Sequence, residues 1–286
     1  MGDEQTGLLI TLPAKPENVA VVRHAVAGLA ERMGMEEPGV GDLKTVVTEA
    51  CMNVVIHAYD EEDGPLQVEV RGEDGGLTVV VRDFGTGIRP RPGIERPSLR
   101  IGLTLIAALS GSFEISGGLG KGTEITMRMP LVSGGGDGQP TDARPAPTPV
   151  DAAELTIGSP DMVAPVLGRV VGALAARRQI TVDRISDATL LTDAIAARAP
   201  IAFGDDDVSL RVSDGADGID LRLGPLPEGA AEKILDGLAL PEVGGTLESL
   251  ADELRVEEAG GGGEYLLVRF ADLAARPGAG SGQESI

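Results

Sequence analysis

The stretch TEACMNVVIHAY, from Thr48 to Tyr59, restricts the fold of this chain more than any other feature of its sequence. Its residues are mostly apolar, and a helix that is apolar nearly all round packs in a core. Glu49, Asn53 and His57 interrupt it at intervals of four residues, so they share one helix face. Because acid and amide groups are costly to bury unpaired, we expect either a buried polar partner or a ligand cavity beside this face.

The composition limits what such a cavity could bind. A chain of 286 residues with 42% hydrophobic residues can form one large domain or two ordinary ones. Aromatic residues make up only 2%, which argues against a nucleic-acid site built on stacking. The net charge of −21 also argues against binding to nucleic acid or anionic membranes. An acidic surface suits a basic protein partner, but it also simply keeps a protein in solution.

The location of the protein is predicted from its cysteine content and its apolar runs. Cys51 is the only cysteine, which fits a reducing compartment and excludes an internal disulfide. The N-terminus has no basic region followed by a long apolar run, and no stretch approaches 18 consecutive apolar residues. We therefore predict a cytoplasmic protein without a membrane segment.

Glycine- and proline-rich segments divide the chain into two blocks. We predict a domain at 5–130, a linker at 131–152, a second domain at 153–273 and a disordered tail at 274–286. In the first block, strands are expected at 7–13, 66–72, 77–83, 112–116 and 123–130, and helices at 16–35, 41–58 and 102–109. The residues EDGG join two of these strands as a hairpin. This order predicts an α+β fold, a two-layer sandwich with helices on one face of a mostly antiparallel sheet.

The second block repeats this order. A shift of 144 residues places Pro16 on Pro160 and the sequence Thr48-Glu49-Ala50 on Thr192-Asp193-Ala194. A consistent order of elements with few identities favours two copies of one domain.

Three glycine-containing motifs follow the polar helix in the first block: RDFGTGI at 82–88, RIGLTLI at 100–106 and GLGKGTEI at 118–125. Glycine allows a backbone to approach a ligand closely, and a glycine opening a helix suits phosphate binding. The last motif lacks P-loop spacing and precedes a strand. Each motif alone is a weak signal, but their joint order is specific. Residues 5–130 resemble the GHKL ATP-binding fold, also called the Bergerat fold, of gyrase-type topoisomerases, sensor histidine kinases and anti-sigma-factor serine kinases.

The resemblance implies a role for each motif. Asn53 would hold Mg²⁺, Glu49 would act as the catalytic base, and Asp83 would accept a hydrogen bond from the adenine amino group. The remaining residues expected to contact ATP are Gly85, Gly87, Ile88, Gly102, Leu103, Thr104, Gly120, Gly122 and Thr123. A mobile lid is expected at about 89–100. His57 fits a structural role better than a ligand-binding one.

The second block lacks the groups that these roles require. Asn53 corresponds to Ala197 and Asp83 to Pro225, and neither replacement can perform the original task. Residues 1–130 carry a net charge of −7, and residues 131–286 carry −14. We expect this half not to bind ATP and to serve as a partner surface or as a built-in dimer mate.

Three functions are compatible with the resemblance. The favoured one is a serine/threonine kinase that binds a sigma factor and phosphorylates a serine of an anti-anti-sigma (STAS-like) protein. The alternative is an ATP-gated binding regulator without kinase activity. A histidine-kinase-like or topoisomerase-like ATPase fits less well, because the only histidines are His24 and His57 and no accessory domain is evident.

Overall fold

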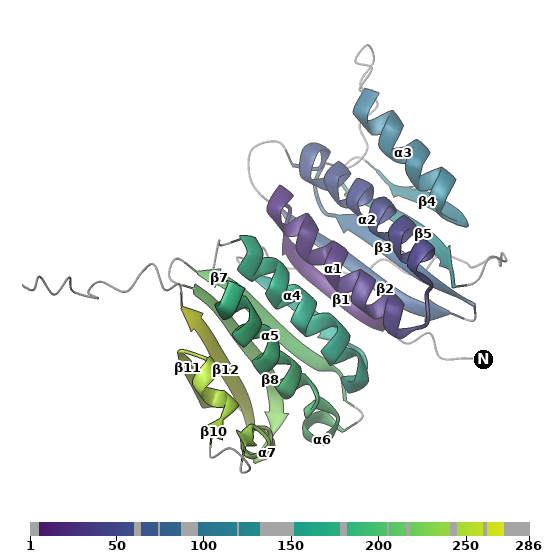
Figure 1. The fold of residues 1–286 in the computed structure, drawn as a ribbon. Coiled ribbons are helices and arrows are strands. Elements are labelled where there is room, and N and C mark those ends of the chain that lie inside the picture. The colour runs from purple at the N-terminus through teal and green to yellow at the C-terminus, as the bar shows by residue number, and fades with distance from the viewer. Residues whose placement is uncertain are drawn as a thin grey trace, which may run out of the picture.

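The computed structural model describes residues 6–59, 64–73, 75–86, 97–118, 120–131, 152–177, 182–204, 206–215, 218–240, 245–259 and 262–271. They form a ten-stranded sheet with helices α1 to α5 on one face (Figure 1). Neighbouring strands in this sheet are antiparallel throughout. The predicted α+β sandwich, with helices on one face of an antiparallel sheet, is confirmed.

The first half contains β1 (Thr6–Pro13), α1 (Pro16–Arg32), α2 (Glu37–His57), β2 (Pro65–Glu73), β3 (Gly76–Asp83), α3 (Pro97–Leu109), β4 (Ser112–Gly117) and β5 (Thr123–Pro130). The predicted hairpin forms, with Glu73 opposite Gly76. Helices α2 and α3 begin four and five residues earlier than predicted. Pro38 and Pro97 lie in their first turns, where a missing N–H leaves no helical bond unmade.

The second half contains β6 (Ala153–Ile157), a 3₁₀ turn η1 (Pro160–Met162), α4 (Val163–Arg177), α5 (Val182–Ala196), α6 (Ala199–Phe203), β7 (Val208–Gly215), β8 (Gly218–Pro227), α7 (Ala230–Asp236), β9 (Ala239–Leu240), β10 (Gly245–Thr246), η2 (Leu247–Leu250), β11 (Glu253–Ala259) and β12 (Gly263–Ala271). Strands β9 and β10 form a separate two-stranded ladder. From the centre of the large sheet outward, the halves run β1-β2-β3-β5-β4 and β6-β7-β8-β12-β11. The matching orders agree with the predicted duplication, which itself stays a prediction.

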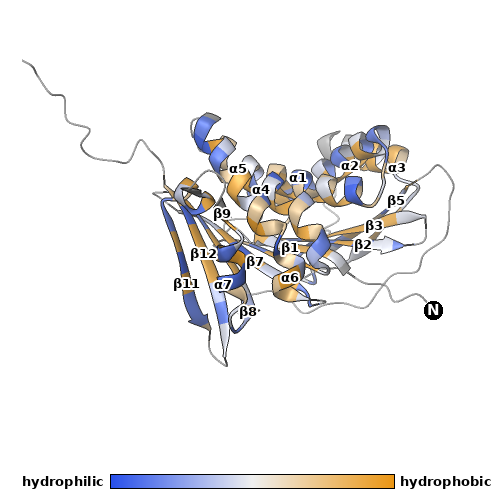
Figure 2. Cartoon of the chain, turned by 60° about the horizontal axis from the view of Figure 1, so that its bottom comes forward, coloured by the Kyte–Doolittle hydropathy of each residue, from blue (hydrophilic) through white to orange (hydrophobic). Residues whose placement is uncertain are grey.

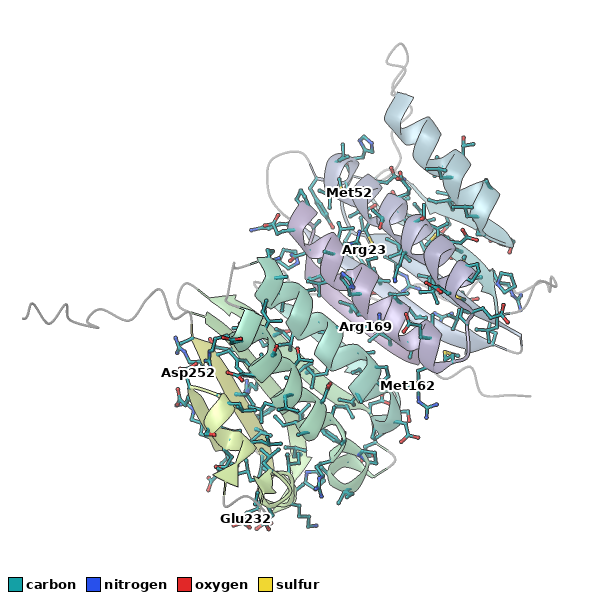
Figure 3. All side chains as sticks on the ribbon, in the orientation of Figure 1. Arg23, Met52, Met162, Arg169, Glu232 and Asp252 are labelled. Carbon is teal, nitrogen blue, oxygen red and sulfur yellow. The ribbon has the colours of Figure 1, made fainter. Side chains whose placement is uncertain are left out.

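The two halves meet along one seam. Strands β1 and β6 pair, with Leu8 opposite Ile157. Above them α1 packs on α4, so closely that a Cβ at Gly28 would lie 2.1 Å from the carbonyl oxygen of Pro165. Arg169 of α4, labelled in Figure 3, forms an ion pair with Glu31 of α1. The halves therefore share one sheet and one helical layer.

The apolar core lies between the helices and the sheet, where hydrophobic residues of both layers gather (Figure 2). It extends through both halves. None of the described helices is long and apolar enough to cross a membrane. The predicted division at 131–152 is not decided by this arrangement, and residues 132–151 and 272–286 lie outside the described residues.

Candidate functional site

Helix α2 holds Glu49 and Asn53 one turn apart, and both side chains are half-buried. Helix α3 brings Gly102 against them. A Cβ at Gly102 would lie 2.7 Å from Oε2 of Glu49 and 3.7 Å from Oδ1 of Asn53. The missing side chain of Gly102 is thus what allows α3 to approach the two polar groups.

The side-chain amide of Asn53 lacks a hydrogen-bond partner for its nitrogen among the described residues, as expected for a group that contacts a bound ligand. Its Nδ2 is buried, and no hydrogen-bond partner for it is found among the described residues. A buried amide left in this state costs about 1–3 kcal/mol. Rotation about the Cβ–Cγ bond would exchange its nitrogen and oxygen, so the same position can present an oxygen to a cation.

A metal held here would need ligands from elsewhere. No group of three or more His, Cys, Asp and Glu side chains in the described part of the chain could hold one. Mg²⁺ is commonly bound by one or two protein oxygens together with substrate phosphates and water. A single oxygen from Asn53 therefore suits Mg²⁺ that arrives with a nucleotide.

Asp83 ends β3 and is only 5% exposed. Its Oδ1 accepts a hydrogen bond from the backbone N–H of Gly85 at 3.0 Å. Burial raises the pKa of Asp83, although hydrogen bonds from Gly85 and from the hydroxyl and N–H of Thr123 oppose the shift. The carboxylate is therefore buried and held in place by donors from the turn after β3 and from the first residue of β5.

Glycines allow the turn after β3 and the turn before β5 to lie against each other. A Cβ at Gly85 would lie 2.0 Å from the carbonyl oxygen of Ala58, at the end of α2. Gly122 has a φ of +73°, and its Cβ would lie 2.1 Å from the carbonyl oxygen of Asp83. The N–H of Gly120 donates to the carbonyl of Thr86 at 3.1 Å. The first and third glycine motifs are thus in direct contact with each other.

The second motif differs from its predicted geometry. Gly102 does not open a helix, because α3 already begins at Pro97. The predicted helix start at Gly102 is therefore wrong, whereas contact between Gly102 and ATP stays a prediction. A Cβ added at this position would meet Glu49. Leu103 is half-buried and Thr104 is exposed.

Other predicted positions lie at the edge of the site or outside the described residues. His57 is the half-buried last residue of α2. Gly87, Ile88 and the first part of the predicted lid, 89–96, are not among the described residues.

Arg82 is the first residue of the RDFGTGI motif, but no role was predicted for it; it supports the site from the opposite face of the sheet. Its guanidinium is 2.7 Å from Oε2 of Glu69 on β2 and 2.5 Å from Oε2 of Glu124 on β5. Glu124 follows Thr123, and Arg82 precedes Asp83. The ion pairs therefore fix the two strand ends that carry the Asp83–Thr123 contact. The alternation of charged and apolar residues in neighbouring strands was the one feature of the sequence that could have indicated these ion pairs.

In the second half, a glutamate side chain at the counterpart of the GxGT turn bonds to the backbone. Glu264, which lies in the predicted counterpart of the GxGT turn, accepts hydrogen bonds from the N–H groups of Gly229 and Ala231 at 2.7 and 3.1 Å. Ala197 falls between α5 and α6, so the counterpart of Asn53 is not even helical. Asp193 is exposed near the end of α5.

Comparisons with known proteins identify the family of this chain. The family described as "Histidine kinase-like ATPase domain" matches residues 12–129. The chain belongs to this GHKL ATPase family, which confirms the resemblance seen in the motifs. Serine-protein kinases RsbW from Bacillus cereus (strain B4264) and Bacillus anthracis (strain A0248) are each 30% identical over 142 residues. Each match covers 45% of this chain and 89% of the relative.

A solved histidine kinase domain, from the blue-light activated histidine kinase of Erythrobacter litoralis EL346, is 22% identical with a TM-score of 0.29. That match covers 42% of this chain and 62% of the other.

Proposed function

We propose that the chain is a Mg-ATP-dependent serine kinase of the anti-sigma type, which transfers the γ-phosphate to a serine of an anti-anti-sigma-like protein. The observation that carries the proposal is the convergence of Glu49 and the unsatisfied amide of Asn53 at Gly102. The similarity to serine-protein kinases RsbW supports the choice of a serine as acceptor. A sigma factor is the second partner that this class implies.

Three residues of the chain would have different roles in the site: one for the metal, one as the base and one for adenine. Asn53 would hold Mg²⁺ through its amide oxygen, and the metal would neutralise charge on the phosphates. Glu49, one turn away on the same helix, would take the proton from the attacking serine hydroxyl. Asp83 would accept from the adenine amino group while Gly85 and Thr123 keep its carboxylate oriented.

The second half is proposed as an internal mate of the first rather than as a second catalytic unit. It pairs with the β1 edge through β6 and covers α1 with α4. The Glu264 carboxylate bonds to backbone N–H groups of its own half, and Pro225, which stands in the place of Asp83, has no side-chain acceptor for a base. The chain would then have one ATP site and a more acidic half available to partners.

The test is phosphate transfer from ATP carrying a radioactive γ-phosphate to candidate anti-anti-sigma proteins of the same organism. Glu49→Gln should lower the transfer rate about 100-fold or more, because the base is lost while the shape is kept. Asp193→Asn is the matched control in the second half and should transfer at the wild-type rate. ATP binding without labelling of any candidate would favour the alternative, an ATP-gated regulator without kinase activity.

A further inference from the structure

Tyr59 lies just beyond α2, where three segments of the first half meet. Its hydroxyl donates a hydrogen bond to the carbonyl oxygen of Pro65 at 2.6 Å. The same hydroxyl accepts one from the backbone N–H of Phe84 at 3.0 Å. One oxygen atom thus connects the end of α2, the start of β2 and the turn after β3.

The ring of Tyr59 is held by two glycines. A Cβ at Gly64 would lie 2.0 Å from Cε1 of the ring, and a Cβ at Gly85 would lie 3.2 Å from Cδ1. No side chain can occupy Gly64 without displacing the ring. The chain on both sides is therefore shaped to receive a tyrosine in this place.

The hydroxyl is well suited to a permanent structural link. Burial raises the pKa of Tyr59 to about 12, against the effect of the Phe84 N–H, and the nearby Asp83 carboxylate adds to the rise. The phenol therefore stays protonated at neutral pH and keeps its donor for Pro65. Phe84 lies between Asp83 and Gly85, so the link acts on the backbone that orients the Asp83 carboxylate.

We infer that Tyr59 is a positioning residue that fixes the base-recognising carboxylate of Asp83 relative to Glu49 and Asn53 on α2. The inference rests on the proposed function, in which Asp83 distinguishes adenine. Loss of the hydroxyl would leave the metal end of the site intact and loosen only the base end. Nucleotide selectivity should fall, whereas a merely structural role would weaken all nucleotides equally.

The experiment measures calorimetric dissociation constants of Mg-ATP and Mg-GTP for the wild-type chain, Tyr59→Phe and Tyr265→Phe. Tyr265 is the only other tyrosine, and its ring lies 3.7 Å from the Arg222 guanidinium, a contact that phenylalanine keeps. For Tyr59→Phe we expect affinity for ATP to fall about tenfold and affinity for GTP to change less than about twofold. Tyr265→Phe should keep both wild-type values.

A second measurement applies even where Tyr59→Phe folds poorly. In a Tyr265→Phe chain grown with 3-fluorotyrosine, position 59 is the sole tyrosine, and its ¹⁹F resonance should shift on saturation with Mg-ATP. Equal weakening of ATP and GTP in Tyr59→Phe, wild-type selectivity in that variant, or an unmoved ¹⁹F resonance would each overturn the inference. A wild-type chain that binds no Mg-ATP would instead remove the proposed function.

Discussion

At the scale of single residues, the absence of a side chain at Gly102 matters as much as the presence of Glu49. Gly102 lies inside α3, where glycine costs about 1 kcal/mol relative to alanine. A Cβ at this position would lie 2.7 Å from the Glu49 carboxylate, which we propose as the catalytic base, so glycine leaves that carboxylate undisturbed. Stability and function therefore favour different residues at this position.

Gly102→Ala should lower phosphate transfer about tenfold or more by displacing Glu49, while the melting temperature stays level or rises. Transfer assays and thermal unfolding on one preparation would measure both effects. Gly172→Ala is the matched control, because Gly172 lies in α4 with nothing within 4 Å of its Cβ position. That variant should gain stability and keep full transfer; equal transfer in both variants would contradict the role given to Gly102.

Sequence reasoning identifies residues whose chemistry stands out within one short motif. Glu49, Asn53 and Asp83 were singled out because polar groups in or after apolar elements require an explanation, and the family resemblance supplied their expected roles. Tyr59 and Arg82 lie in the quoted motifs but were given no role, since their partners lie on other segments, such as Phe84 for Tyr59 and Glu124 for Arg82. Only the folded chain shows which backbone groups these side chains meet.

At the scale of elements, β2, β3 and β5 are joined by ion pairs on the sheet face opposite the helices. Glu69 of β2 is 2.8 Å from Arg71 and 2.7 Å from Arg82. Burial disfavours the charged form of Glu69, but hydrogen bonds from Arg71 and Arg82 outweigh it and lower its pKa to about 2. Between pH 4.5 and about 2, the Glu69 carboxylate is therefore mostly ionised in the folded chain and mostly protonated in the unfolded chain.

The sign of the pH effect follows from this lowered pKa. Above the ordinary pKa of 4.5 the stabilisation by Glu69 is fully present, and it is lost as the pH falls from there toward about 2. The loss should be of the order of 3 kcal/mol. Urea unfolding at pH 6, 4 and 3 should show a smaller pH dependence in Glu69→Gln than in the wild type.

Glu253 provides the control for Glu69. It pairs with Arg255, but both side chains are about half exposed, so the pair should contribute at most about 1 kcal/mol. Glu253→Gln should follow the wild-type pH dependence. A Glu69→Gln variant that also follows it would show that Glu69 is not the group responsible.

Element types were more predictable than element ends. The strands and the hairpin followed from alternation and glycine turns, whereas α2 and α3 started earlier because proline is tolerated in a first turn. In the second half α5 ends at Ala196, and Pro200 lies in the first turn of α6. A proline cannot continue a helix interior, so the uninterrupted α2 has a broken counterpart. The ungapped shift of 144 residues gave no sign of this break.

At the scale of the whole molecule, the second half protects a sheet edge. Without β6, strand β1 would expose a row of unpaired backbone groups, and α1 would lose its contact with α4. We therefore expect the full chain to be a monomer of 29.3 kDa by light scattering at micromolar concentration. A fragment of residues 1–135 should associate or lose solubility. A concentration-independent dimer of the full chain would contradict the internal-mate proposal.

We propose that this chain has a single ATP site, formed by α2, β3, α3 and the turn before β5 in its first half. Titration calorimetry with Mg-ATP tests it most directly, on the wild type, Asp83→Asn and Asn53→Ala. We predict one site per chain, with affinity about tenfold lower or worse in each variant, because each loses a distinct contact with the nucleotide or its metal. Two sites, no site, or wild-type affinity in both variants would contradict the account.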